Sequence, residues 1–422
     1  MAGIDSIEYA ALSYCWGENL PLCTTTDVLA QFTQEIPSDL MPATFADAMK
    51  ITRALGIPYI WIDALCIVQD DSEDWQREAA VMNKVYGGCQ LTIAASQSRD
   101  SATGCFPVLD QDFINQDVSF RAHNRLIRFY YDDVRIRPGS GNTLSARAWA
   151  LQEQIPREPP QTPASALRLR IRWEKIVENY SERLLTYERD RVPAVAGVIQ
   201  SFASVMPNNE SILGLWRATL ARDMAWSRLS VRVQERGLGD PALPSWTWLA
   251  CPGPATFRWW EDTPPSSDGT PTKRSRGPKE HLHLLTSKIE WSGTPYTSPL
   301  KSAHLEVEAP VMTIALRPTR EQLKGKMYGY FQVFGENLRG DASEFYRCFG
   351  FLDHGDLTGP APFPCMLLFT SPKGQGEAYE VFIIMEPVGP PEDRRFRRIG
   401  AAGLLGKTPA FDLEKKMTIT LV

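Results

Sequence analysis

Long apolar runs and paired cysteines are both missing from this 422-residue sequence. The longest apolar stretches, Tyr59 to Val68 and Cys365 to Phe369, are much shorter than the roughly 18 residues that a membrane-spanning helix needs. The eight cysteines are scattered and never form a C-x-x-C pair, so neither a zinc knuckle nor a disulfide framework is indicated. The sequence therefore predicts a cytoplasmic protein with no membrane span.

Histidine and excess positive charge are also scarce. Of the five histidines only His281 and His283 lie close together, and no cysteine or carboxylate cluster accompanies them, so no metal site is predicted. The net charge of −5 provides no basic field that would attract a phosphate backbone. Nucleic acid is therefore not an expected partner.

The sequence does contain enough apolar residues for more than one core. Hydrophobic residues make up 43% of the chain, and its length exceeds the roughly 250 to 300 residues at which single cores stop growing, so two or three units are expected. We predict an α/β module in residues 1–155 with its core at about 8–100, a mainly helical extension over 156–250, a linker or exposed loop over 251–280 and a β-rich region over 281–422.

Residues 9 to 56 show a strand pattern followed by a helix pattern. Tyr9 to Tyr14 are typical of a short buried strand. Apolar residues recur at helical spacing from Phe45 to Leu55, which predicts a helix of about three turns. Thr44 and Asp47 are placed as a capping box for this helix, and Gly56 as its stop.

The pattern then repeats. Tyr59 to Val68 combine aromatic and β-branched residues without polar alternation, which predicts a strand covered on both faces and central in a parallel sheet. The turn Gln69 to Ser72 supplies the N-cap of one helix that runs to Gly87-Gly88, and Leu91 to Ala95 predict a third strand. Such alternation implies right-handed crossovers, with functional groups gathered at the carboxyl ends of the strands, including this acidic turn.

Several segments of this module carry a family resemblance. Tyr9 to Gly17 (YAALSYCWG), Pro42 to Ala48 (PATFADA) and Tyr59 to Asp71 (YIWIDALCIVQDD) resemble, in order and spacing, the leading motifs of the heterokaryon-incompatibility (HET) domain. Met82 to Tyr86 and Arg147 to Glu153 (RAWALQE) resemble later motifs, so the resemblance covers roughly residues 8 to 155. It implies a fungal protein of non-self recognition and programmed cell death, remotely similar in fold to Toll/interleukin-receptor (TIR) domains. Its expected partners are other proteins, including further copies of itself.

The resemblance also suggests an enzymatic alternative. TIR-like enzymes cleave NAD at the nicotinamide-ribose bond with a glutamate on the helix after a central strand, often within a Trp-x-x-Glu pattern, and Trp75 to Glu78 (WQRE) look similar. The reaction passes through an oxocarbenium-like state, which a carboxylate can stabilise. Glu78 is thus the candidate catalytic residue, with NAD as a substrate and no resident cofactor. The other interpretation is a rim glutamate paired with a basic neighbour.

Six further residues are candidates for ligand contacts. They are Ser13, Trp16, Asp63, Gln69, Asp70 and Trp75. Asp63 falls within a buried segment, where a carboxylate is costly without hydrogen-bonded partners. It could contact a ligand or anchor a neighbouring loop. Gln69 and Asp70 could equally form only the turn and cap, and Trp16 could belong to the core.

Two other motifs favour structural interpretations. Arg147, Trp149 and Glu153 could pack against the module or pair with its acidic loop. Ala401 to Thr408 (AAGLLGKT) satisfy a loose phosphate-binding-loop pattern, but a true loop of this kind lies between a buried strand and a helix. An arginine-rich segment precedes this one and Pro409 follows it, so nucleotide binding there is not expected.

Overall fold

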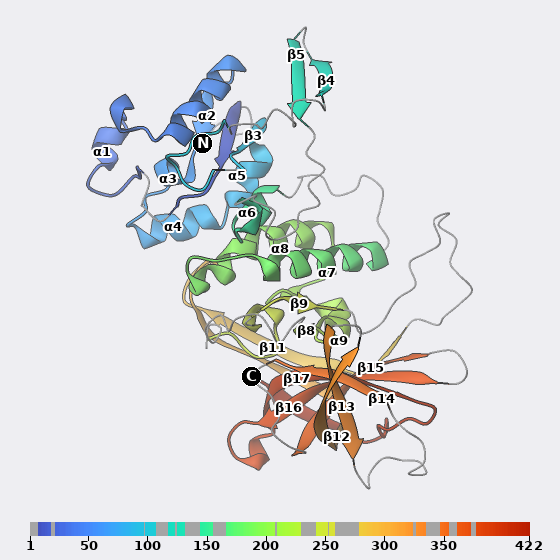
Figure 1. Cartoon of the computed structure of the whole chain (residues 1–422). Coiled ribbons are helices and arrows are strands. Elements are labelled where there is room, and N and C mark those ends of the chain that lie inside the picture. The colour runs from blue at the N-terminus through green and yellow to red at the C-terminus, as the bar shows by residue number, and fades with distance from the viewer. Residues whose placement is uncertain are drawn as a thin grey trace. The chain divides into compact units, whose positions relative to one another are not determined.

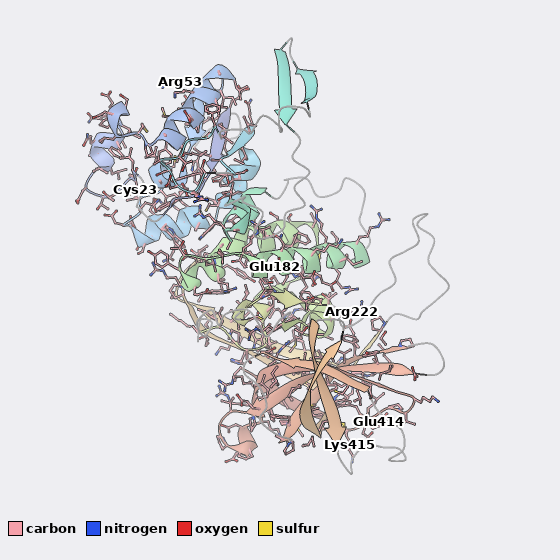
Figure 2. All side chains as sticks on the ribbon, in the orientation of Figure 1. Cys23, Arg53, Glu182, Arg222, Glu414 and Lys415 are labelled. Atoms are coloured by element: carbon pink, nitrogen blue, oxygen red, sulfur yellow. The ribbon has the colours of Figure 1, made fainter. Side chains whose placement is uncertain are left out.

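The chain forms two compact units. The computed structural model describes residues 7–17, 22–96, 98–106, 117–122, 125–130, 144–154, 166–206, 209–228, 242–251, 253–257, 278–323, 326–334, 347–353, 361–372 and 377–422. Unit 1 consists of Met1–Pro159 and Arg183–Ser201, and unit 2 of Pro160–Glu182 and Phe202–Val422. Figure 1 labels their elements, and Figure 2 adds the side chains, with Arg53 marking the last turn of α2 (Ala43–Ala54).

Unit 1 is built on a parallel sheet of three strands. These are β1 (Tyr9–Ser13), β2 (Tyr59–Trp61) and β3 (Leu91–Ala94), in the order β2-β1-β3. Both pairings of β1 are parallel, with Tyr9 beside Tyr59 and Ala10 beside Leu91. The predicted parallel α/β architecture of the N-terminal module is therefore confirmed.

The prediction of one central strand from Tyr59 to Val68 is mostly wrong. β2 ends at Trp61, and the short helix α3 (Asp63–Cys66) takes up the next part of the apolar run. β2 also lies at an edge of the sheet, and β1 is its central strand. The reason lies in Asp63, whose carboxylate accepts a hydrogen bond from the Ala64 amide at 2.7 Å and whose carbonyl accepts one from Ile67 at 3.1 Å. Local bonds of this kind compete with a strand ladder.

The first predicted helix is present, but its predicted capping box is wrong. The N-cap of α2 is Pro42, so Thr44 already lies inside the helix, and its hydroxyl bonds the backbone of the loop that follows β3. The carboxylate of Asp47 accepts from the Cys105 amide at 3.2 Å instead of capping the helix. Gly56 does end the segment, in the left-handed region at φ 75°.

Two helices occupy the segment predicted as one. These are α4 (Ser72–Ala79) and α5 (Met82–Gly88), separated at Val81, whose φ of −114° and ψ of 1° break the helix. Asp71 caps α4 as expected, accepting from the Glu73 amide at 2.9 Å. The predicted stop at the glycine pair is also confirmed, since α5 ends at Gly88.

The remaining described elements of unit 1 are short. They are α1 (Leu29–Phe32), η2 (Ser38–Leu40), β4 (Asp117–Ala122), β5 (Arg125–Tyr130), η4 (Leu144–Ala146), α6 (Ala150–Gln154), η5 (Glu188–Arg191) and the first part of α8 (Pro193–Val205). β4 and β5 pair as an antiparallel hairpin. α5, α6 and α8 meet at Gly197, where a Cβ atom would lie 2.6 Å from both Asn83 Cβ and Gln152 Oε1. Only glycine allows this approach of the three helices.

The helical part of unit 2 surrounds an aromatic core. Its elements are α7 (Ala166–Glu182), β6 (Ser211–Ile212), β7 (Leu215–Trp216), η6 (Arg217–Thr219), α9 (Leu220–Asp223), β8 (Ser227–Arg228), η7 (Trp248–Ala250) and β9 (Ala255–Thr256). The carbonyl of Gly214 accepts from both Trp173 Nε1, at 3.2 Å, and Trp248 Nε1, at 2.8 Å. Two buried indoles thus share one acceptor, which satisfies both donors.

A nine-stranded sheet forms the rest of unit 2. Its strands are β10 (Lys279–Glu280), β11 (His283–Trp291), β12 (Leu300–Leu323), β13 (Lys326–Phe334), β14 (Arg347–Leu352), β15 (Ala361–Pro372), β16 (Ala378–Pro387), β17 (Arg395–Gly406) and β18 (Lys416–Leu421), with η9 (Pro391–Asp393) before β17. β12 pairs with β15 as well as β13, so the ladder β12-β13-β14-β17-β16-β15 returns to its first strand. The predicted β-rich C-terminal region is confirmed.

The loose phosphate-loop pattern proves to be a strand. Ala401 to Gly406 lie in β17, which pairs antiparallel with β14 and β16. This is not the strand–loop–helix setting that a phosphate-binding loop requires. Most of the predicted linker, residues 258–277, lies outside the described residues. Among the residues that are described, none of the helices is both long and apolar enough to cross a membrane.

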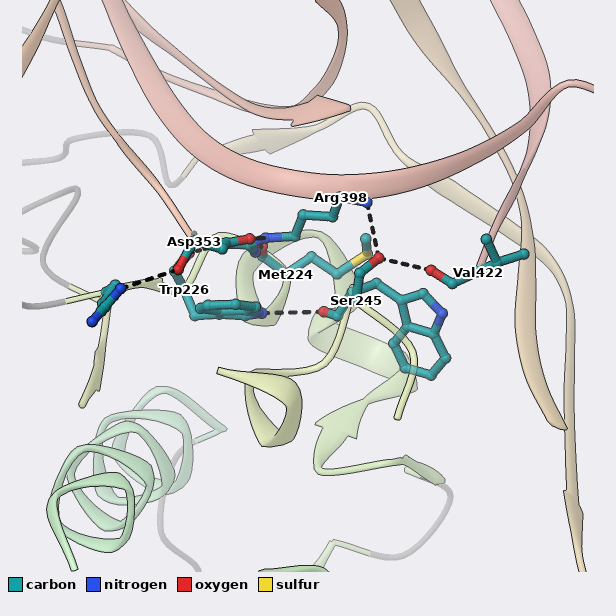
Figure 3. Close-up of polar contacts among 8 residues, drawn as sticks. Met224, Trp226, Ser245, Asp353, Arg398 and Val422 are labelled. Atoms are coloured by element: carbon teal, nitrogen blue, oxygen red, sulfur yellow. Dashed lines mark hydrogen bonds and ion pairs between the residues drawn. The ribbon is translucent and has the colours of Figure 1, made fainter. Parts of the chain in front are cut away.

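Arg398 of β17 is hydrogen-bonded to the helical part of unit 2 and forms a buried ion pair with Asp353, which directly follows β14 (Figure 3). Arg398 Nε lies 2.9 Å from Asp353 Oδ2, and both side chains are buried. The same guanidinium stacks 3.5 Å from the Trp226 ring centroid and donates to the carbonyls of Met224 and Trp226. Beside it, Ser245 Oγ donates to the Val422 carbonyl at 2.7 Å. The cation is therefore neutralised and hydrogen-bonded, as a buried charge must be.

Candidate functional site

The candidate site lies at the carboxyl end of β1. The chain passes from β1 to β2 on one side of it and later to β3 on the other side. The strand order therefore reverses at β1, and in open parallel sheets such a reversal leaves a crevice outside the carboxyl ends of the strands where ligands bind. Polar side chains from four separate segments gather around this end of β1.

The two faces of β1 bring in different partners. Tyr14, directly after the strand, packs edge-on against Phe45 of α2, with ring centroids 5.1 Å apart. Ser13 belongs to the opposite face by strand alternation, and its hydroxyl donates to Glu153 of α6. Cys15 follows the same alternation and packs with Leu144 and Ala150. The end of β1 is thus enclosed by α2 on one face and by the segment around α6 on the other.

Asp63 is held in this cluster by short hydrogen bonds. Its Oδ2 accepts from Trp16 Nε1 at 2.8 Å, and its Oδ1 accepts from the Ala64 amide at 2.7 Å. Burial raises the pKa of the carboxyl, and the Trp16 hydrogen bond and the nearby Arg147 cation oppose that rise. The structure therefore brings the predicted pair Trp16 and Asp63 into direct contact.

Glu153 is the second carboxylate of the cluster. Burial raises its pKa to about 7, the Ser13 hydrogen bond and the Arg147 charge lower it, and the Asp63 charge raises it. The carboxyl consequently changes its protonation state near neutral pH. A group with this property can give up or accept a proton under the conditions of the cell.

Arg147 supplies the positive charge between these groups. Its Nη1 donates to the Tyr14 carbonyl, and its own carbonyl accepts from Arg183 Nη1 at 3.0 Å. A parallel bridge to Leu184 further fixes the backbone of Arg147. The guanidinium lowers the pKa of both Asp63 and Glu153 and so favours their ionised forms, in opposition to burial, which raises both values.

Two tyrosines complete the cluster. The Tyr86 hydroxyl donates to the Leu12 carbonyl at 2.9 Å, which ties α5 to β1. Tyr14 is only 3% exposed, and its hydroxyl lies beside the Asp63 carboxyl, where a hydrogen bond between them raises the pKa of Tyr14 and lowers that of Asp63. Burial and the charge of Asp63 raise the pKa of Tyr14, so the hydroxyl keeps its proton and remains a donor.

Glu78 is not part of this hydrogen-bonded cluster. It lies on α4 with Oε1 3.6 Å from Arg77 Nε, and its side chain is 27% exposed. This contact fits the rim-glutamate interpretation, and a catalytic role for Glu78 stays a prediction. Trp75, from the same motif, packs edge-on against Trp149 at 5.9 Å between ring centroids.

Gln69 and Asp70 lie beside the cluster, and their side chains make hydrogen bonds to neighbouring loop segments. Gln69 Nε2 donates to the carbonyls of Asp63 and Ile67, each at 3.1 Å. The carboxylate of Asp70 accepts from the Thr26 hydroxyl at 2.7 Å and from the Thr26 amide at 2.8 Å, and these bonds lower its pKa. Both contacts are structural, and ligand binding by these two residues stays a prediction.

Four cluster residues were not among the sequence-based site candidates. They are Tyr14, Tyr86, Arg147 and Glu153. Arg147 and Glu153 stood out only as part of a late motif, because Glu153 lies 140 positions from its partner Ser13 in the sequence. The sequence signal for these two residues was that an arginine and a glutamate stand at the two ends of one short motif, Arg147 to Glu153. Within the described residues, no group of three histidines, cysteines or carboxylates is placed to hold a metal ion.

These features define a class: an α/β module whose parallel sheet carries a charged cluster at the carboxyl end of its central strand. The family model described as Heterokaryon incompatibility protein (HET) matches residues 9–153, a segment that contains every residue of the cluster. This part of the chain is therefore a HET domain, which implies a role related to heterokaryon incompatibility. Neither a curated protein nor a solved structure matches the chain.

Proposed function

We propose that this is a signalling and interaction protein of fungal non-self recognition, acting in the cytoplasm, whose HET domain triggers programmed cell death by assembly with other proteins. The observation that carries the proposal is the family match over residues 9–153. The matched segment folds as a module with its own parallel sheet and core, as a transferable signalling unit should.

The edge of the sheet supports assembly as the mode of action. β2 pairs only with β1 among the described strands. Tyr59 on this strand is 60% exposed, and Leu55 at the end of α2 is 44% exposed. An open strand edge with exposed apolar side chains can pair with another chain. Self-association through β2 is therefore the physical route that we propose.

Regulated expression in a filamentous fungus tests this function. Cell death, scored by vital-dye uptake, should rise with the amount of protein, and purified chain should associate more as its concentration increases. Tyr59→Lys should weaken both, because it places a charge at the strand edge. Leu285→Lys is the matched control, since Leu285 is 48% exposed on β11 of unit 2. Absence of death at high expression would argue against the proposal.

The second candidate is a TIR-like NAD glycohydrolase with Glu78 as the catalytic carboxylate. It is favoured by the WQRE motif on α4 and by the 27% exposure of Glu78, which leaves the carboxylate within reach of a substrate. Nicotinamide release from NAD by purified protein should then disappear in Glu78→Ala. Glu73→Ala is the matched control, because Glu73 is an exposed carboxylate on the same helix. Release that is absent, or unchanged in Glu78→Ala, removes this candidate.

A further inference from the structure

One segment of unit 1 lies outside the residues that the family model matches. It is Arg183–Ser201, which we call the return segment because it follows α7 of unit 2 along the chain and yet belongs to unit 1. The Ala148 amide donates to the Leu184 carbonyl at 2.9 Å, and the Leu184 amide donates to the Ala146 carbonyl at 2.6 Å. The return segment therefore holds the backbone on both sides of Arg147.

Arg183, the first residue of the return segment, acts on the charged cluster. Its Nη1 donates to the Arg147 carbonyl at 3.0 Å, and the Arg183 side chain is buried. Its charge lowers the pKa of Glu153, as the charge of Arg147 does. A cation from outside the matched residues thus contributes to the charge state of a carboxyl within them.

The part of the return segment that belongs to α8 contacts two helices of the matched residues. Gly197 lies against Asn83 of α5 and Gln152 of α6, and its carbonyl accepts from Asn83 Nδ2 at 3.3 Å. The helix is buried on either side of this glycine, at Val195 and Val198. Burial of these apolar side chains stabilises the docked segment.

We propose that the return segment is a positioning element of the HET domain, in which Arg183 holds Arg147 and adds a second cation near Glu153, while α8 holds α5 and α6 together. The working HET unit then comprises residues 9–153 and Arg183–Ser201. The chain leaves unit 1 before α7 and returns to it after α7, so the two pieces are joined only through unit 2. This role concerns how the cluster is held, so it requires neither cell-death activity nor NAD cleavage.

The pH dependence of unfolding tests the role of Arg183. The free energy of unfolding of a chain minus that of the same chain with Glu153→Gln falls with rising pH, and the fall ends near the folded-state pKa of Glu153. Arg183 favours the ionised carboxyl, so Arg183→Ala should move this end point to higher pH. Arg183→Lys keeps the charge and should return the end point toward that of the unmodified chain.

Arg189→Ala is the matched control for the charge. Arg189 belongs to the same segment, but its side chain is 79% exposed, so water and salt screen it. The end point should stay unchanged in this variant. An unchanged end point in Arg183→Ala, or an equal shift in Arg189→Ala, overturns the role of Arg183.

Native-state hydrogen exchange on the unmodified chain avoids any loss of folding in the variants. The Leu184 amide reports the return segment, and the Leu151 amide, which donates to the Ala148 carbonyl at 3.2 Å, reports α6. If the segment holds α6 in place, the two amides should show equal free energies of opening. A lower value for Leu184, with Leu151 still protected, would mean that the segment detaches alone, which overturns the proposal.

Gly197→Ala tests the contact of α8 with α5 and α6. The added Cβ would lie 2.6 Å from Asn83 Cβ and from Gln152 Oε1, so the helices must shift apart. We expect amide exchange in α5 and α6 to become about tenfold faster or more. Gly253→Ala is the matched control in unit 2, because the nearest atom to its added Cβ lies at an ordinary 3.4 Å. Unchanged exchange in Gly197→Ala overturns the role of α8.

A last readout rests on the proposed function. Where the unmodified chain kills fungal cells, Gly197→Ala should reduce vital-dye uptake and Gly253→Ala should leave it unchanged. Full killing by Gly197→Ala, despite faster exchange in α6, overturns the positioning role. Absence of killing by the unmodified chain removes only the proposed function, because the pH and exchange measurements still decide the role of the return segment.

Discussion

At the scale of single residues, the charged cluster consists of buried carboxyls together with the hydrogen-bond donors and the cation that offset the cost of their burial. Asp63 is compensated by the Trp16 indole and a backbone amide, and Glu153 by the Ser13 hydroxyl. Arg147 offsets both charges without a direct ion pair to either carboxylate within 4.0 Å in the described structure. Carboxyls with a perturbed pKa beside a cation occur both at functional sites and in structural ion networks.

Glu153 should make the stability of the protein depend on pH in a defined direction. Its pKa rises from an ordinary 4.5 to about 7 on folding, so the folded state holds the proton more tightly. Its contribution to stability is complete below about pH 4 and is lost as the pH rises through 4.5 to 7. The free energy of unfolding of the native chain minus that of Glu153→Gln should therefore fall by about 1–3 kcal/mol between pH 4 and pH 8.

Urea denaturation of both proteins at the two pH values measures this difference. The subtraction removes the other titrating groups, since they are common to both chains. A difference that stays constant, or that grows with pH, would mean that Glu153 is ionised throughout and that its burial is weaker than described.

Arg398 should be the most sensitive single side chain of unit 2. Arg398→Met leaves Asp353 buried without its cation, which costs about 3–5 kcal/mol of the free energy of unfolding. The double variant Arg398→Met, Asp353→Leu should be less destabilised than the single one, because it leaves no uncompensated charge. The midpoint of guanidinium denaturation measures both, and equal losses in the two variants would contradict this account.

At the scale of elements, the sequence pattern predicted the positions of segments better than their ends. The apolar spacing predicted α2, and Asp71 predicted the start of α4. The pattern predicted a strand from Tyr59 to Val68 because nine of its ten residues are apolar, and hydrophobicity alone does not distinguish a buried strand from a strand followed by a helical turn. Asp63 decides between them through its bonds to local backbone, and that effect needs the structure to be seen.

The turn between β6 and β7 should depend on Gly214. This residue lies at φ 79°, and an added Cβ would lie 2.9 Å from Trp248 Nε1. Gly214→Ala therefore combines a left-handed backbone with a clash against the indole that donates to its carbonyl. We expect a loss of about 2–5 kcal/mol in the free energy of unfolding, measured by chemical denaturation.

Gly56→Ala is the matched control for the clash. Gly56 has nearly the same φ, 75°, but nothing lies within 4 Å of the added Cβ. It should lose only about 1–2 kcal/mol, the cost of the backbone conformation itself. Similar losses at both glycines would show that the packing against Trp248 contributes nothing.

At the scale of the whole molecule, the sequence predicted the order of architectures but not the contacts that build the site. The parallel module and the strand-rich C-terminal region follow from local periodicity. Ser13 and Trp16 were predicted because they lie at the end of the first strand, and Asp63 because a carboxylate in a buried segment needs partners. Glu153 was not, because a contact across 140 positions leaves no trace in local spacing. The boundaries predicted at 155, 250 and 280 stay predictions.

The measurement that tests the central claim most directly compares cell killing by two carboxylate variants of the full chain, Glu153→Gln and Glu78→Gln, at equal expression. Assembly through β2 needs an intact module, and Glu153 accepts a hydrogen bond from Ser13 of the neighbouring strand β1, so we expect Glu153→Gln to reduce vital-dye uptake and Glu78→Gln to leave it unchanged. Full killing by Glu153→Gln, with loss of killing in Glu78→Gln, would contradict the account and transfer the function to α4.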